Sequence, residues 1–297
     1  MHLLSGTIRT GQLCMLLLLA FLQISPLLAD DDRNRGLLWE IGREGQPASF
    51  LFGTIHSEEP GVLALPVPVQ QTFDAAHIVV LEVLLDLDAM LYSSQVMLLE
   101  KGRLLSEIAG EELFEQASRA IQTRGIPEVV LDRMKPWAAA VTLSMPTPET
   151  GEVLDMRLYL GALQAGKPVY GLESIREQLA IFDDMPEREQ LVLLQDAVAN
   201  FPEIDAMHRE LIEAWKQRDL GKLLEINAAA MQAGDRQLAE EFQELLVNRR
   251  NRLMAERLHP YLQQGNAFVA VGALHLPGET GLLNLLEQRG YTLRVLY

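Results

Sequence analysis

Two stretches near opposite ends of the chain, Phe50-Leu51-Phe52-Gly53-Thr54-Ile55-His56 and Phe268-Val269-Ala270-Val271-Gly272-Ala273-Leu274-His275, have the same construction. Each is an apolar run that closes on Gly-x-x-His, and each is followed by a Pro-Gly loop. A buried strand that ends in glycine and then presents an imidazole places that group at the carboxyl edge of a sheet, where open α/β sheets bind ligands. Two such strands in one chain predict a single site built from both ends of the sequence.

The pattern between these stretches is mostly helical. A hairpin is expected at 37–41 and 49–55, a buried strand at 78–83, and a strand–helix–strand unit at 267–296. Between them the sequence predicts one strand at 168–172 and helices at 67–76, 87–99, 110–124, 127–145, 153–165, 175–182, 187–199, 204–217, 220–231 and 236–263. Because distant strands on either side of helices usually share one sheet, we expect a single α/β domain. Its central mixed sheet would combine N-terminal, C-terminal and one middle strand, with a large helical insertion.

The first 29 residues predict a secretory signal peptide. Arg9 is their only lysine or arginine, residues 14–28 are strongly apolar, and Ala29 precedes three aspartates. This order is typical of a cleaved signal, so we expect cleavage after Ala29, a domain over residues 30–297, and a periplasmic or secreted protein. The alternative is an uncleaved anchor that contacts the membrane, although the apolar run is short for a span of roughly 20 residues.

Composition narrows the possible partners and chemistry. Cys14 is the only cysteine, so the mature chain would contain none, which excludes disulfides and thiol catalysis. Without residues 1–29, which hold one Arg and no acid, the chain has 24 basic and 41 acidic residues and a net charge of −17. Phosphate groups would be repelled by this charge, so no nucleic-acid partner is expected.

Four side chains capable of chemistry follow predicted strands: His56, Glu82, Glu173 and His275. Two imidazoles and one or two carboxylates can bind a divalent transition metal and leave a position for water. The metal would lower the pKa of that water, and a nearby carboxylate could accept its proton. A single histidine after a strand is more often structural, but here the same frame occurs twice. Glu82 lies within an apolar run, where an unpaired carboxylate is costly, whereas Glu173 could instead be the first-turn acid of the next helix.

Other polar residues give weaker signals. Ser57 has no Gly-x-Ser-x-Gly frame, which argues against a serine hydrolase. Arg250 and Asn251 lie on a predicted helix and either belong to the charged surface or reach the site to orient a substrate carbonyl. The remaining histidines of the mature chain have surroundings typical of structural or surface positions: His77, His208 and His259.

Taken together and in order, these segments resemble the TraB/PrgY/GumN family, which includes the Tiki proteases of animals. The resemblance covers nearly the whole mature chain. Its matching segments are Leu38-Trp39-Glu40-Ile41, Phe52-Gly53-Thr54-Ile55-His56, Val80-Leu81-Glu82, Lys135-Pro136-Trp137, Leu154-Asp155, Gly166-Lys167-Pro168-Val169-Tyr170-Gly171-Leu172-Glu173 with Gln178, Arg250-Asn251-Arg252-Leu253-Met254, and Val271-Gly272-Ala273-Leu274-His275-Leu276-Pro277-Gly278.

The resemblance implies a fold similar to the haem-binding ChaN proteins and the erythromycin esterases. Tiki-type members are described as metal-dependent peptidases that use paired Gly-x-x-His motifs and a glutamate. Carried to this chain, that description points to His56 and His275 with Glu82, and with Glu173 as a further candidate ligand. It also places Arg250 and Asn251 where the family has polar residues near the site.

We therefore expect an exported metal-dependent hydrolase that acts as a peptidase on a peptide or protein substrate. His56 and His275 would bind Mn²⁺, Co²⁺ or Zn²⁺, Glu82 would be a ligand or general base, and Arg250 or Asn251 would position the substrate or stabilise the oxyanion. Two alternatives use the same cleft. One is a non-catalytic protein that binds peptide, haem or metal, and the other is a metal-free esterase in which His56 activates water directly.

Overall fold

The computed structural model describes residues 32–231 and 241–297, so the predicted signal peptide lies outside the described residues. Six strands form one mixed sheet in the order β4-β3-β5-β2-β1-β6. Their bounds are β1 Leu38–Gly42, β2 Ser49–Thr54, β3 Ile78–Val83, β4 Val169–Glu173, β5 Ala267–Gly272 and β6 Thr292–Val295. The predicted α/β architecture is confirmed: a single domain in which both ends of the chain and one middle segment share a sheet.

The parallel part of the sheet carries the two Gly-x-x-His stretches. β4, β3, β5 and β2 run parallel to one another, whereas β1 is antiparallel to both β2 and β6. β5 pairs with β2 so that Gly53 lies opposite Val271 and Thr54 opposite Gly272. The apolar sequences of β3 and β5 reflect this position, because parallel strands are covered on both faces.

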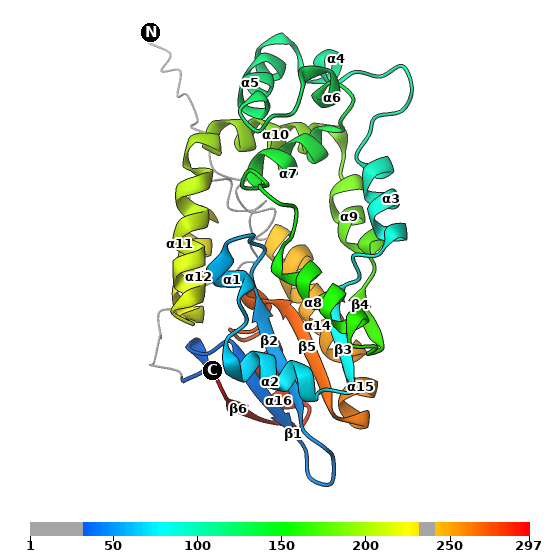
Figure 1. Ribbon diagram of the computed structural model, residues 1–297. Coiled ribbons are helices and arrows are strands. Elements are labelled where there is room, and N and C mark those ends of the chain that lie inside the picture. The colour runs from blue at the N-terminus through cyan, green and yellow to red at the C-terminus, as the bar shows by residue number, and fades with distance from the viewer. Residues whose placement is uncertain (1–31, 232–240) are drawn as a thin grey trace.

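Helices cover the sheet and extend beyond its carboxyl edge. In Figure 1, α2 and α8 lie in front of the sheet and α14, α15 and α16 behind it, while α4–α7 and α10 form a separate layer at the far end. The helix bounds are α1 Pro60–Leu63, α2 Val67–Ala75, α3 Leu87–Val96, α4 Leu105–Ala109, α5 Glu111–Gln122, α6 Glu128–Leu131, α7 Pro136–Ser144, α8 Leu154–Gln164, α9 Ile175–Asp183, α10 Glu187–Asn200, α11 Ile204–Lys216, α12 Leu220–Met231, α14 Arg249–Arg257, α15 His259–Gln264 and α16 Leu282–Gln288.

Two long predicted helices are divided in the structure. The helix expected at 127–145 is α6 and α7, because Lys135 precedes a proline and adopts an extended conformation (φ −64°, ψ 151°), after which Pro136 opens α7. The described part of the helix expected at 236–263 contains a π-helical turn, Glu244–Asn248, followed by α14 and α15. Proline in the first turn of α15 marks this second division.

Aromatic side chains join the sheet to the helices around it. Phe268 of β5 contacts Phe52 of β2 and Phe73 of α2, with ring centroids 6.0 Å and 5.3 Å away. Trp137 of α7, in the outer helical layer, stacks on Phe182 of α9 with ring centroids 5.9 Å apart. Within residues 32–231 and 241–297, no helix has both the length and the apolar character needed to cross a bilayer.

Candidate functional site

The two Gly-x-x-His stretches end side by side at the carboxyl edge of the sheet. A Cβ atom on Gly53 would lie 3.1 Å from Cα of Ala273, and one on Gly272 would lie 3.4 Å from Oε2 of Glu82. Both glycines therefore permit a close approach of backbone or carboxylate that a side chain would disturb. The predicted convergence of the two stretches on one edge is confirmed by the pairing of β2 with β5.

His275 is buried and its tautomer is fixed by Asn251. The Nδ2 group of Asn251 donates to the Thr280 carbonyl at 2.9 Å, which leaves its Oδ1 to accept from Nδ1 of His275 at 2.6 Å. Burial lowers the pKa of His275, and Arg250 adds to this effect while Glu82 opposes it. The imidazole is therefore neutral at neutral pH, and its Nε2 lone pair lies 3.7 Å from Oε2 of Glu82.

Glu82 is held as an anion by three donors. Its Oε1 accepts from Arg250 Nη2 at 2.5 Å and from Gln178 Nε2 at 3.1 Å, and its Oε2 accepts from the Gly272 N–H at 2.9 Å. Burial alone would raise the pKa of Glu82, but the positive charges of protonated His275 and of Arg250, together with the hydrogen bonds from Gly272 and Arg250, lower it from 4.5 to about 2. Of these two cations, Arg250 is the one that stays charged at neutral pH, because its pKa is raised whereas that of His275 is lowered. A carboxylate with so low a pKa is a weak proton acceptor and is better suited to binding a cation.

Glu173 is the second carboxylate bound by Arg250. The Nε group of Arg250 lies 3.1 Å from Oε1 and 3.0 Å from Oε2 of Glu173, and Nη2 lies 2.6 Å from Oε2. Gln178 also donates to Oε2, at 3.0 Å, and so bridges both glutamates. Both oxygens of Glu173 are engaged in fixing Arg250, so its role as a metal ligand stays a prediction from the sequence.

Arg250 and Asn251 lie beside Glu82 and His275, and the contacts they make there are with protein groups. Arg250 neutralises two carboxylates and also donates from Nη1 to the Leu246 carbonyl at 3.1 Å. Asn251 is only 1% exposed and orients His275. In this arrangement both residues position the groups of the site, and charge-assisted bonds make the Arg250 contacts strong.

His56 lies on the more open side of the site and faces Asp155. Its side chain is 46% exposed, and its Nδ1 is 4.0 Å from Oδ2 of Asp155 in the first turn of α8. The Thr54 hydroxyl donates to Oδ1 of Asp155 at 2.8 Å. Burial raises the pKa of Asp155, and the negative charge of Glu82 adds to the rise while His56 opposes it. The negative charge of Glu82 therefore acts on Asp155, the carboxyl group that faces His56.

Sequence reasoning did not assign chemistry to Asp155 or Gln178, although both stand in the segments that carry the family resemblance. An acid in the first turn of a helix is usually explained by the helix dipole alone, so the sequence offered no separate reason to place Asp155 in the site. The sequence signal that could have identified Asp155 is that Leu154-Asp155 is one of the segments that resemble the family. Gln178 has no charge, and only its place in α9 brings its amide to both glutamates.

The donor groups suit a divalent cation in their chemistry. A neutral imidazole whose other nitrogen is held by a second residue, next to an ionised carboxylate, is the arrangement that metal-binding histidines commonly have. His275 and Glu82 provide it, and His56 and Asp155 are the further donors. In the part of the chain that the structure describes, no group of three carboxylate, imidazole or thiol side chains forms a preassembled metal cluster.

The pKa values of the two carboxyl groups Glu82 and Asp155 are shifted in opposite directions. Glu82 has a pKa lowered to about 2 and stays charged, whereas the pKa of Asp155 is raised and brings this carboxyl closer to working as a proton acceptor near neutral pH. Pairs of carboxyl groups whose pKa values are shifted in opposite directions are typical of sites that transfer protons. The arrangement therefore places a permanently charged carboxylate, Glu82, and a more readily protonated carboxyl group, Asp155, in the same region.

Comparisons with known proteins agree along almost the whole described chain. The model of the TraB/PrgY/gumN family matches residues 37–295. The chain is 25% identical over 257 residues to the uncharacterized protein YbaP of Shigella flexneri and 24% identical over 257 residues to YbaP of Escherichia coli K12. Each match covers 84% of this chain and 91% of the relative. No solved structure matches the chain.

Proposed function

The chain belongs to the TraB/PrgY/gumN family, and from that premise we propose that it is an exported metal-dependent hydrolase that cleaves peptide bonds. One observation carries the proposal: Nε2 of neutral His275 lies 3.7 Å from the ionised carboxylate of Glu82. Two electron-pair donors held this close favour a cation between them. Export is part of the proposal through the predicted signal peptide and implies a mature chain that begins near Asp30.

Each residue has a distinct role in the proposed reaction. His275, Glu82 and His56 hold a divalent metal ion such as Mn²⁺, Co²⁺ or Zn²⁺, which would lower the pKa of a bound water molecule. Asp155, with its raised pKa, accepts the proton of the attacking water and is oriented by Thr54. Asn251 keeps the lone pair of His275 directed at the site.

Arg250 has a positioning role in this proposal. It holds the carboxylate of Glu82 and is itself fixed by Glu173. Because its guanidinium is saturated by these two carboxylates, it orients the metal-binding glutamate and does not contact the substrate. The backbone of Gly272 provides the remaining hydrogen bond to Glu82.

A metal-free hydrolase is the second candidate, and one observation favours it. Arg250 already places a positive charge at Glu82 and Glu173, so these carboxylates have a cation without a metal. In that case His56 and Asp155 would activate water directly. This candidate predicts hydrolysis that a chelator does not affect.

The test measures metal and turnover on the same preparation. Purified full-length protein is analysed for bound metal by mass spectrometry, and a peptide library is incubated with it with and without a chelator. We expect near-stoichiometric Mn²⁺, Co²⁺ or Zn²⁺ and cleavage that the chelator removes and the metal restores. Cleavage that survives the chelator would favour the metal-free hydrolase, and tight metal or peptide binding without cleavage would favour the non-catalytic binding protein.

Glu82→Gln should lower kcat by about two orders of magnitude or more and reduce bound metal, while the fold is retained. The amide keeps the shape of the carboxylate but loses the charge that attracts the cation. Rates and metal content are compared with those of Glu40→Gln, because Glu40 pairs with Arg294 on the exposed surface of β1. A folded Glu82→Gln protein with the wild-type rate would remove Glu82 from the mechanism.

A further inference from the structure

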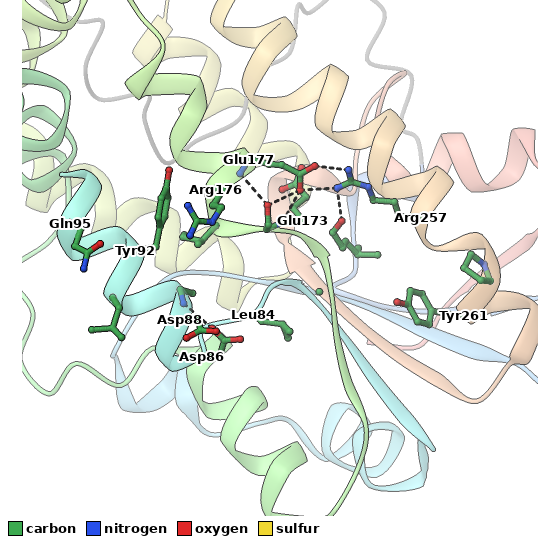
Figure 2. Close-up of a pocket in the computed structure, with 17 residues that line it drawn as sticks. Leu84, Asp86, Asp88, Tyr92, Gln95, Glu173, Arg176, Glu177, Arg257 and Tyr261 are labelled. Carbon is green, nitrogen blue, oxygen red and sulfur yellow. Dashed lines mark hydrogen bonds and ion pairs between the residues drawn. The ribbon is translucent and has the colours of Figure 1, made fainter.

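A pocket of about 970 Å³ lies beside the candidate site, at the outer edge of the sheet. It is bordered by the carboxyl ends of β3 and β4, by α3, by the start of α9, and by residues of α14 and α15. Figure 2 shows Tyr261 at one end of the pocket and Tyr92 with Gln95 at the other. Glu173 borders this pocket and also binds Arg250, so it connects the pocket to the candidate site.

The pocket contains the unpaired side of an edge strand. β4 is the terminal strand of the sheet and pairs only with β3 within the described residues. The Val79 N–H bonds to the Pro168 carbonyl, which fixes the side of β4 that faces β3. Alternate residues of a strand direct their backbone groups to opposite sides, so the N–H and C=O of Val169 and Gly171 face outward. Gly171 lines the pocket and has no side chain to block this backbone.

An outward-facing strand edge is a template for an extended chain. Its N–H and C=O groups can bond to a peptide that adds as another strand, and this backbone pairing is a common mode of peptide recognition. Specificity then comes from pockets that receive alternate side chains of the added strand. The pocket beside β4 provides both the free backbone groups of the strand edge and space for the side chains of an added strand.

Charge in the pocket favours a basic side chain. Four carboxylates and two guanidinium groups line it: Asp86, Asp88, Glu173, Glu177, Arg176 and Arg257. Glu177 is bound by Arg257 at 2.6 Å, and Glu173 by Arg250 at 2.6 Å. Asp86 and Asp88 lie together at the start of α3 (Figure 2), where Asp86 accepts the Ala89 N–H at 2.8 Å. Arg176 is the remaining cation of the lining, so these two carboxylates leave a net negative charge that attracts a cationic group and repels an acidic one.

The remaining walls are apolar or aromatic. Tyr261 packs against Tyr170 of the edge strand, with ring centroids 5.1 Å apart and the rings tilted by 37°. Tyr92 is covered on one face by the guanidinium of Arg176, at 3.8 Å from the ring centroid. Leu84 and Leu91 also line the pocket, and Leu91 is 50% exposed. These surfaces suit apolar side chains of an extended peptide.

We propose that this groove binds an extended peptide segment with apolar and basic side chains, which adds as a strand to the free edge of β4. The identification of that peptide as a substrate rests on the proposed hydrolase function; the binding mode does not. Because β4 ends at Glu173, which binds Arg250, a segment laid along β4 continues toward the candidate site.

The first experiment tests the charge and apolar preference. A fluorescein-labelled octapeptide of alternating Val and Lys is titrated with full-length protein in the presence of chelator, and anisotropy gives Kd. We expect it to bind at least tenfold more tightly than the matching Val–Glu peptide. Asp88→Asn should weaken binding about threefold, the size of an exposed charge contact, whereas Glu210→Gln on α11 should leave it unchanged. Equal affinity for the two peptides, or no effect of Asp88→Asn, would overturn the proposal.

The second experiment tests the backbone pairing itself. Two forms of the Val–Lys peptide carry N-methyl groups on alternate residues, one set on every Val and the other on every Lys. Only one set of N-methyl groups can face β4, and that set removes several hydrogen bonds to the strand. We therefore expect one methylated form to bind at least about tenfold more weakly. The other form should bind within about threefold of the unmethylated peptide. Equal affinities of the two methylated forms would overturn strand addition.

The outcomes also separate this proposal from the hydrolase proposal. Binding with the expected pattern but no cleavage under any metal condition would support the groove and overturn the peptidase. Cleavage of the Val–Lys peptide at rates insensitive to Asp88→Asn and to N-methylation would support the peptidase and overturn the groove. A dimer in sedimentation that fails to bind peptide would overturn the proposal and assign the β4 edge to a second copy of the chain.

Discussion

Arg250→Ala should reduce the free energy of unfolding by about 3–5 kcal/mol, because removing one partner of a buried ion cluster leaves uncompensated charge. The guanidinium contacts both Glu82 and Glu173, and all three side chains are largely buried. Arg250→Lys should recover part of the loss, since one ammonium group cannot reproduce the planar fork of donors. Urea denaturation of the three proteins measures the effect.

Arg252→Ala is the matched control. Arg252 is two residues along the same helix, but its guanidinium is half exposed and pairs with the exposed Glu244. An exposed pair contributes about 1 kcal/mol or less. Equal losses in the two alanine variants would contradict the view that Arg250 holds the site together.

The pH dependence of stability gives a second readout for the same cluster. The pKa of Glu82 is lowered from 4.5 to about 2 in the folded protein. Its contribution to stability is therefore present above about pH 4.5 and is lost as the pH falls through about 2. Wild-type protein should lose stability across this window, and Glu82→Gln should lose less.

Alanine at either histidine of the paired stretches should remove most bound metal and lower kcat/KM by about two orders of magnitude or more. If His56 and His275 serve one site, the double variant should be little worse than either single variant, because groups that act as a unit have non-additive effects. Metal content and kcat/KM are measured for the two single variants and the double variant. His77→Ala, at an exposed position before β3, is the control and should change neither quantity.

The two variants should differ in stability even if they agree in activity. His275 is 4% exposed and bound to Asn251, so its removal leaves a buried amide oxygen without its donor. His56 is half exposed and makes a 4.0 Å contact with Asp155, so its removal should cost less stability. Metal that stays bound in both single variants, or additive losses in the double variant, would contradict a shared site and favour the metal-free hydrolase or the binding protein.

The sequence by itself determined the sheet and the place of the site. Short, mainly apolar segments define the six-residue strands β2, β3 and β5, because strand formation depends on a local pattern. The repeated Gly-x-x-His frame placed His56 and His275 at one edge, because parallel strands of one sheet end at the same side. Helix ends were less well determined, as the division of 127–145 at Pro136 shows.

The tertiary structure alone decided which groups are paired and which remain available. Arg250 is 168 residues from Glu82 and 77 from Glu173 along the chain, and no local pattern shows that one guanidinium serves both. The same holds for the contact of Asp155 with Thr54, 101 residues away. Residue type fixes which bonds a side chain can make, but the donors that reach it, and the burial that shifts its pKa, depend on helices brought together by the whole fold. For this reason the sequence located Glu82 in the site, and the structure identified it as an anion held by Arg250.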